Sequence, residues 1–264
     1  MLKIVVLGSA AGGGFPQWNC NTEACRSARA GDALARTQSS IAVSGDVGNW
    51  FLFNASPDLR QQLLRAEIRR LDAVLFTHGH ADHLHGIDDL RGINKAMNAA
   101  LTVYCDAETR ETIENRFSYT LTPLKPEVDF YYKPVLDINE ISVGDSLSIG
   151  AVDIQSFDQS HGFSHTLGFR FGPIGYSTDL LELPEESFQA LDGVHTWIIG
   201  VFSWTPHYTH AHVDKALEWI ERVKPVRAVL THLGPSIDYA KLNDYLPDGV
   251  EAAYDGMVIE ADGD

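Results

Sequence analysis

The stretch Thr77-His78-Gly79-His80-Ala81-Asp82-His83 is the most informative part of this chain. It follows a mostly apolar run, residues 71–76, that has the length of a buried strand. Three imidazoles and a carboxylate at the end of a buried strand are costly to remove from water unless they bind something. Imidazole nitrogen and carboxylate oxygen are ligands of zinc and related divalent ions. The stretch therefore predicts a metal site.

The pattern H-x-H-x-D-H at residues 78–83 resembles the hallmark motif of the metallo-β-lactamase superfamily. The chain resembles that superfamily along nearly its whole length. This resemblance implies an α/β fold in which two similar half-domains form a four-layer αββα sandwich, with metals between their strand ends. Residues 71–78, LDAVLFTH, are similar to residues 226–232, VRAVLTH, as two related half-domains would require. We expect residues 1–264 to form a single metallo-β-lactamase-like domain.

The resemblance also implies a full set of ligands, each placed after a strand, for two divalent ions. We expect zinc or manganese, with iron as an alternative. One ion is assigned to His78, His80 and His161, the other to Asp82, His83 and His232, and Asp179 bridges them. His165 is an alternative to His161, because both flank the same loop. We prefer His161, since a His-Gly pair before a hairpin matches related sequences.

Composition and pattern agree with one large α/β domain. The chain has 264 residues, of which 44% are hydrophobic, enough for a single core. Strand-like and helix-like runs alternate, as α/β folds require. Expected helices are residues 57–66, 106–115, 184–191 and 213–223. The last has apolar residues at 213, 216, 217, 220 and 223, a stripe that would face a core.

The net charge of −16 argues against binding to nucleic acid or to anionic membranes, which requires clustered Lys and Arg. The first apolar run, residues 1–7, is too short for the core of a signal peptide and reads as a strand. No segment is long and apolar enough to span a bilayer. With three cysteines and no export signal, we expect a cytoplasmic protein. We also expect its substrate to be small and anionic, because two divalent ions with two carboxylate ligands would leave a positive centre. A homodimer is left open.

Two branches of the superfamily are similar to different parts of the chain. Residues 6–21, 36–43 and 54–63 resemble pyrroloquinoline quinone biosynthesis protein B, a branch in which the His-rich motif is degraded. Here the motif is intact. The remainder resembles cyclic phosphate phosphodiesterases of the phosphonate pathway, through residues 77–83, 85–91, 176–179, 205–210 and 231–232.

An intact ligand set favours a dinuclear metal-dependent hydrolase, in which a hydroxide that bridges the ions attacks a small, possibly cyclic, phosphodiester. Asp82 then belongs to the catalytic centre as well as to the ligand set. The alternatives are a cofactor-biosynthesis protein like the first branch and an iron-dependent oxidoreductase on the same fold.

Further catalytic candidates lie outside the motif. In the phosphodiesterase branch a His from the loop before residues 213–223 acts near the leaving group, so we favour His210 as general acid or phosphate contact, with His207 next. An ordinary surface role for both is the alternative. Arg91 could bind substrate phosphate, although a helix surface charge is equally expected.

Relatives in both branches often hold a structural zinc through three cysteines and a His. Here Cys20 and Cys25 remain, but Thr22 and Pro235 occupy the other two positions, so we expect no zinc there. Cys105 ends an apolar strand and is expected in the core. The Gly-rich residues 8–14 lack the phosphate-loop pattern and predict a tight connection. An alternative is that their N–H groups face an anionic substrate.

Overall fold

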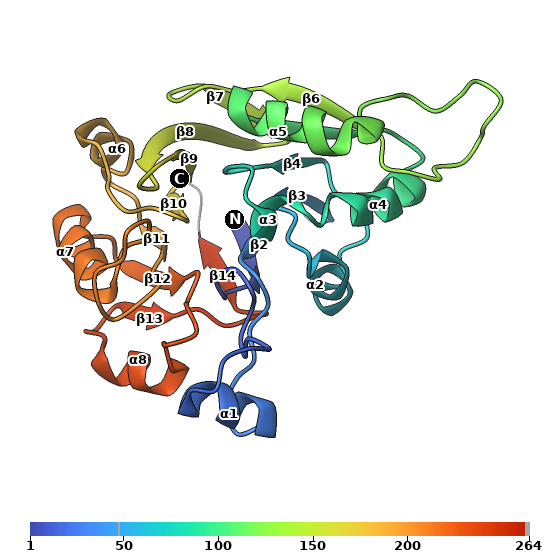
Figure 1. Ribbon diagram of the computed structural model, residues 1–264. Helices are drawn as coiled ribbons and strands as arrows, with labels where there is room; N and C mark the ends of the chain where they lie inside the picture. The colour runs from blue at the N-terminus through green and yellow to red at the C-terminus, as the bar shows by residue number, and fades with distance from the viewer. Residues whose placement is uncertain (47, 262–264) are drawn as a thin grey trace.

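Two seven-stranded sheets face each other in the computed structural model, which describes residues 1–46 and 48–261 (Figure 1). The first sheet has the order β14-β1-β2-β3-β4-β5-β6. Its strands are β1 Leu2–Gly8, β2 Ser40–Asp46, β3 Asn49–Phe53, β4 Ala73–Leu75, β5 Leu101–Cys105, β6 Leu136–Glu140 and β14 Val258–Ala261. The second sheet has the order β13-β12-β11-β10-β9-β8-β7. Its strands are β7 Ser146–Ile149, β8 Val152–Ser160, β9 His165–Phe171, β10 Ile174–Ser177, β11 Thr196–Gly200, β12 Arg227–Thr231 and β13 Val250–Ala252.

The side chains of the first sheet alternate between two hydrophobic cores, one between the two sheets and one beneath the helices on its outer face. In β1, Ile4 and Val6 point into the central core between the sheets, whereas Val5 and Leu7 point to the outer face of the first sheet. This is the two-residue period of a strand that is covered on both sides. The central core is rich in aromatic rings, and Phe53 contacts the rings of the opposite sheet at centroid distances of 5.0–5.4 Å.

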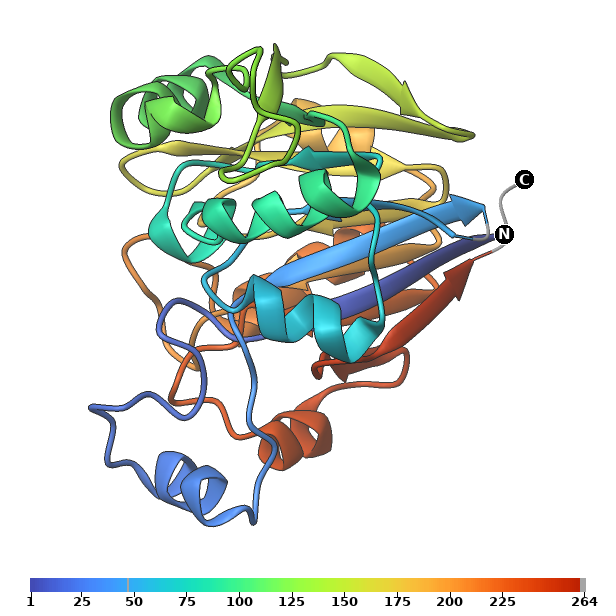
Figure 2. The same ribbon diagram turned by 90° about the vertical axis from the view of Figure 1, so that its right-hand side faces the viewer.

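Helices cover the outer faces and complete four layers, as Figures 1 and 2 show. The first sheet carries α2 Leu59–Ala66, α4 Leu90–Met97 and α5 Ala107–Phe117, with the short α3 Ala81–Leu84, η1 Ile87–Asp89 and η2 Ser118–Thr120 between or after them. The second carries α6 Glu185–Ala190, α7 Val213–Val223 and α8 Tyr239–Tyr245. The expected α/β class and αββα sandwich are therefore confirmed.

The helix boundaries follow local signals. Helix α7 has the expected bounds, and its stripe Val213, Ala216 and Ile220 is buried against the second sheet. Helices α2, α5 and α6 lie within one to two residues of the expected ends. Helices α1 Glu23–Ala30, α4 and α8 were not among the expected helices. Among the residues described, no helix is long and apolar enough to cross a membrane.

Because several strands are parallel, the loops that carry the His and Asp residues lie at one edge of the sandwich. Strands β3 to β6 are parallel to one another, and so are β10 to β13. The carboxyl ends of parallel strands share an edge, where ligand sites are usual in such sheets. The two similar segments end there. The first runs through β4 to Thr77-His78, and the second runs through β12 to Thr231-His232.

Candidate metal centre

The proposed ligands all lie at strand ends or just beyond them. His78 and His80 follow β4, and α3 supplies Asp82 and His83. His161 directly follows β8. Asp179 and His232 come after β10 and β12 with φ of 52° and 54°. Left-handed backbone at non-glycine residues is strained and is retained where the fold holds it for a purpose.

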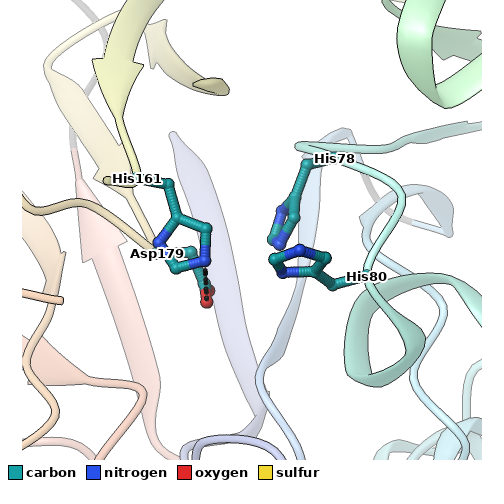
Figure 3. A group of neighbouring side chains, drawn as sticks. All are labelled: His78, His80, His161 and Asp179. Atoms are coloured by element: carbon teal, nitrogen blue, oxygen red, sulfur yellow. Dashed lines mark ion pairs between the residues drawn. The ribbon is translucent and has the colours of Figure 1, made fainter. Parts of the chain in front are cut away.

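These side chains converge into two groups that share Asp179. The first comprises His78, His80, His161 and Asp179, and the second comprises Asp82, His83, Asp179 and His232. In each group one ligand atom per residue lies within 4.8 Å of the others. Figure 3 shows the first group, with His78 and His80 across from His161 and Asp179. His161, and not its rival His165, is part of this cluster.

Asp179 uses its two carboxylate oxygens in different directions. Its Oδ2 lies 2.9 Å from His83 Nε2 and 3.2 Å from His232 Nε2. Its Oδ1 lies 3.9 Å from His161 Nε2, in the other group. Asp82 Oδ2 lies 3.2 Å from His83 Nε2, on the same side as His232. A carboxylate with one oxygen toward each group is suited to join two cations.

Hydrogen bonds set the tautomers of two histidines for metal binding. His161 Nδ1 lies 2.7 Å from the carbonyl oxygen of Thr209, so this nitrogen carries the proton and Nε2 keeps its lone pair. Thr77 Oγ1 donates to the side chain of Asn54, so it can only accept from His78 Nδ1, 3.0 Å away. His78 Nε2 then has a free lone pair, is buried and has no hydrogen-bond partner. Such outer hydrogen bonds orient metal-binding imidazoles.

The charges of the buried side chains in the cluster favour the binding of a cation. Burial alone would raise the pKa of Asp179 and of Asp82, but the surrounding imidazoles hold both pKa values well below their usual range. Burial would lower the pKa of His83, but Asp179 and Asp82 raise it to about 10. Burial lowers the pKa of His78 strongly and that of His161 to about 4, which keeps both neutral. A divalent ion can replace the proton that His83 would otherwise carry, so the residues present fit bound metal.

Asn54 connects the motif to the first sheet and was not anticipated as a site residue. It is fully buried at the end of β3, with φ of 65°. Its Oδ1 accepts from Thr77 N and Thr77 Oγ1, at 2.9 and 3.1 Å. Its Nδ2 lies 2.8 Å from His83 Nδ1, a contact that fixes the ring and turns Nε2 toward the carboxylates. The only sequence signal was its place in a segment shared with relatives.

The cluster opens into a cleft of about 450 Å³, within the usual range for small-molecule sites. Ala11 and Gly12 of the Gly-rich loop form part of its wall. A Cβ on Gly12 would lie 3.1 Å from Asp82 Oδ2, so any other residue would crowd this carboxylate. Gly13 and Gly14 have φ of 87° and 68°, in keeping with the expected tight connection. The other wall includes Phe163, Ser164, Phe202 and Thr209.

His210 lies inside the cleft, and His207 stands behind it. His210 Nε2 is 3.1 Å from Asp179 Oδ1, and its ring stacks between Phe202 and His232 at 4.8 and 5.2 Å. Its Nδ1 lies 2.8 Å from Thr209 Oγ1 and 3.2 Å from His207 Nδ1. Burial and His210 lower the pKa of His207, which favours its neutral form.

Three residues weighed from the sequence lie elsewhere. Arg91 does not line the cleft: it borders a separate cavity with Phe130 and Tyr132 and donates to the Tyr132 carbonyl at 3.4 Å. We therefore do not assign it to the metal centre. His165 is exposed and pairs with Asp158 at 3.0 Å. Thr22, in the place of a cysteine, caps α1 by accepting from Cys25 N and contacts Cys20 Sγ.

The fold and the paired His/Asp groups define a class of protein. The chain belongs to the metallo-β-lactamase superfamily, and residues 49–233, which include every proposed ligand, match the family model of the β-lactamase superfamily domain. Over 98% of its length it is 31% identical to coenzyme PQQ synthesis protein B of Azoarcus sp. and covers 99% of that protein. It is 29% identical over 97% of its length to an octanoyltransferase of Porphyromonas gingivalis, of which it spans only 51%.

Solved structures are similar over the whole chain. A crystal structure of a new diphosphatase from the PhnP family has a TM-score of 0.89 and 26% identity, with 100% of this chain and 99% of that chain covered. The Zn²⁺-bound PqqB of Methylobacterium extorquens has a TM-score of 0.81 and 22% identity, with coverage of 98% and 100%. The second likeness concerns the fold alone.

Proposed function

We propose that this protein is a dinuclear metal-dependent hydrolase of small anionic phosphodiesters or diphosphates. The observation that carries the proposal is Asp179, which directs one oxygen toward each of two histidine groups while His210 faces the same carboxylate from the cleft. The likeness to a PhnP-family diphosphatase supports a phosphoryl substrate. Zinc or manganese fits the mixed imidazole and carboxylate donors.

His78, His80, His161 and Asp179 would hold one ion, and Asp82, His83, Asp179 and His232 the other. When bound, divalent ions in such sites act as Lewis acids and lower the pKa of water towards neutrality. Asp179 and Asp82 offset only part of the positive charge of two divalent ions. The cleft would then attract an anion even though the whole protein is acidic.

We assign the transfer of a proton to His210. Stacking between Phe202 and His232 fixes its ring, and Thr209 contacts its Nδ1, so Nε2 points to the cleft. A proton held on Nε2 can pass to the leaving oxygen of a substrate bound in the cleft beside His210. His207 supports His210 from behind. The cleft volume suits a small substrate, and the net charge of −16 is unfavourable for a polynucleotide.

The test is hydrolysis of bis-p-nitrophenyl phosphate by protein loaded with Zn²⁺ or Mn²⁺. Activity should disappear on chelation, return with metal, and be lost in His80→Ala. The His165→Ala variant is the matched control, because His165 lies near the same loops but outside both groups. A metal-loaded protein that cleaves neither this ester nor a diphosphate would overturn the proposal and favour a biosynthetic or redox role.

The role of His210 is tested with leaving groups. His210→Ala should lose about a hundredfold in kcat on an alkyl phosphodiester and much less on a p-nitrophenyl ester, whose phenolate leaves without a proton. Equal losses on both substrates would instead make His210 a binding residue.

A further inference from the structure

Three aromatic side chains stand almost fully in solvent on loops around the metal cleft. Phe163 is 93% exposed, Trp18 90% and Tyr208 85%, the highest values for large apolar residues among those described. Isolated exposed apolar residues are ordinary, but three on loops around one cleft are not. Because rings so exposed contribute little to the core, the stability of the fold does not explain why they are aromatic.

Phe163 and Tyr208 belong to two loops that touch each other. Phe163 lines the cleft, two residues after His161. The backbone of Gly162, with φ of 77°, packs so closely on the second loop that a Cβ there would lie 2.7 Å from the Tyr208 carbonyl oxygen. His161 Nδ1 also donates to the next carbonyl, that of Thr209. The two rings therefore project from backbone that is held firmly against the metal ligands.

Trp18 lies on a third loop with a similar anchor. Gln17 Nε2 donates to the carbonyl of Gly12 at 2.9 Å, and Gly12 is part of the cleft wall beside Asp82. The cleft thus combines a floor of His and Asp with exposed aromatic rings on its surrounding loops. Such a combination favours a ligand with an anionic part and a planar apolar part.

We propose that Phe163 and Tyr208 form a stacking platform for a nucleobase, so that the natural substrates are mononucleotide-type phosphodiesters or diphosphates. This inference rests on the proposed hydrolase function and adds the group that the substrate carries beyond its phosphate. Aromatic side chains stack on any base face, whereas the acidic surface disfavours a long polynucleotide. The cleft volume of about 450 Å³ is in the range for one small ligand.

The test compares two esters with the same leaving group, thymidine 5′-p-nitrophenyl phosphate and methyl p-nitrophenyl phosphate. The wild-type protein should prefer the thymidine ester in kcat/KM by about tenfold or more, given what one stacked base contributes. Phe163→Ala and Tyr208→Ala should each remove most of that preference, because they should lower kcat/KM for the thymidine ester far more than for the methyl ester. Phe130→Ala is the control, an exposed aromatic residue that borders the separate cavity.

A binding measurement separates this inference from the proposed chemistry. In saturation-transfer NMR with thymidine 5′-monophosphate and zinc-loaded protein, the base protons should receive the strongest saturation, and the two variants should abolish this pattern. If neither these esters nor a diphosphate is cleaved, the hydrolase proposal fails, whereas the NMR pattern still decides the platform.

Three results would overturn the platform. One is no preference between the esters together with no saturation of the base protons. Another is an equal loss on both esters in the variants. The third is a wild-type dimer that Phe163→Ala or Tyr208→Ala converts to monomers in analytical ultracentrifugation, because the rings would then be covered by a second copy.

Discussion

His161 Nδ1 donates a hydrogen bond to the carbonyl oxygen of Thr209, 2.7 Å away. This contact ties a proposed metal ligand on one loop to the loop that carries His207 and His210. The side chain of the same threonine, through Oγ1, contacts His210 Nδ1 at 2.8 Å. Thr209 therefore serves the metal group with its backbone and the proposed proton donor with its side chain.

These two roles can be separated by Thr209→Val. The carbonyl remains, so the metal content should stay the same, whereas the hydroxyl that orients His210 is lost. We expect kcat on an alkyl phosphodiester to fall about tenfold, less than for removal of His210. Activity on a p-nitrophenyl ester should change little. Loss of metal in this variant would show that the loop acts mainly through His161.

The metal stoichiometry follows from the two groups that share Asp179. Elemental analysis should find about two divalent ions per chain, since each group offers enough ligands for one. Asp179→Ala should lose most of at least one ion, because both groups lose a ligand. His165→Ala should retain the wild-type content. A wild-type protein purified in excess metal that holds none would contradict the assignment of all seven ligands.

Asn54→Ala should destabilise the fold as well as the site. The substitution leaves the buried N–H of Thr77 without its acceptor, at a cost of about 1–3 kcal/mol, and keeps a left-handed backbone without the asparagine that tolerates it. Asn98→Ala is the matched control: it has φ of 51° but is exposed, and none of the described hydrogen bonds uses its side chain. In urea unfolding, Asn54→Ala should lower the free energy of unfolding more than Asn98→Ala does, because only Asn54 makes buried hydrogen bonds. Equal losses in the two variants would contradict this role of Asn54.

Cys105 predicts a stability change at high pH. Burial, with a smaller effect of Asp106, raises the pKa of its thiol to about 12 from the ordinary value of 9.0. The folded protein therefore keeps a proton that the unfolded chain releases, so this stabilising contribution is complete below pH 9 and is lost as the pH rises toward 12. The free energy of unfolding of the wild type, measured against Cys105→Ala, should fall above pH 9 by up to about 1.4 kcal/mol per pH unit. A difference independent of pH would show that the thiol ionises freely.

The sequence predicted the parts of the structure whose signals are local. The His-rich stretch and the two segments that end in Thr-His indicated ligands at strand ends, and the structure places these residues in one cluster. Helix α7 had a clear apolar stripe and was predicted residue for residue. Helices α1 and α8 are short, and the side chains of Thr22 and Asp238 cap their N-termini.

The parts that were missed depend on contacts between distant segments. Nothing near Asn54 indicates that it supports His83, 29 residues later. The approach of Gly12 to Asp82 likewise depends on how the first loop returns over the sheet edge. Arg91 was considered for phosphate binding because it follows the motif closely, but α4 directs it to another cavity. Proximity in sequence to a motif does not imply proximity to its chemistry.

The direction of β1 has a practical consequence. The strand starts at Leu2, which pairs with Ala261 of β14, and runs to Gly8, shortly before the residues that wall the metal cleft. Leu2 and Ala261, which pair in the first sheet, thus lie about 23 Å, one strand length, from the metal cleft. A fluorescent protein or surface tether joined next to Leu2 or Ala261 would therefore be attached far from the cleft. Immobilised protein could then be assayed, or screened for ligands, with its mouth open to the solution.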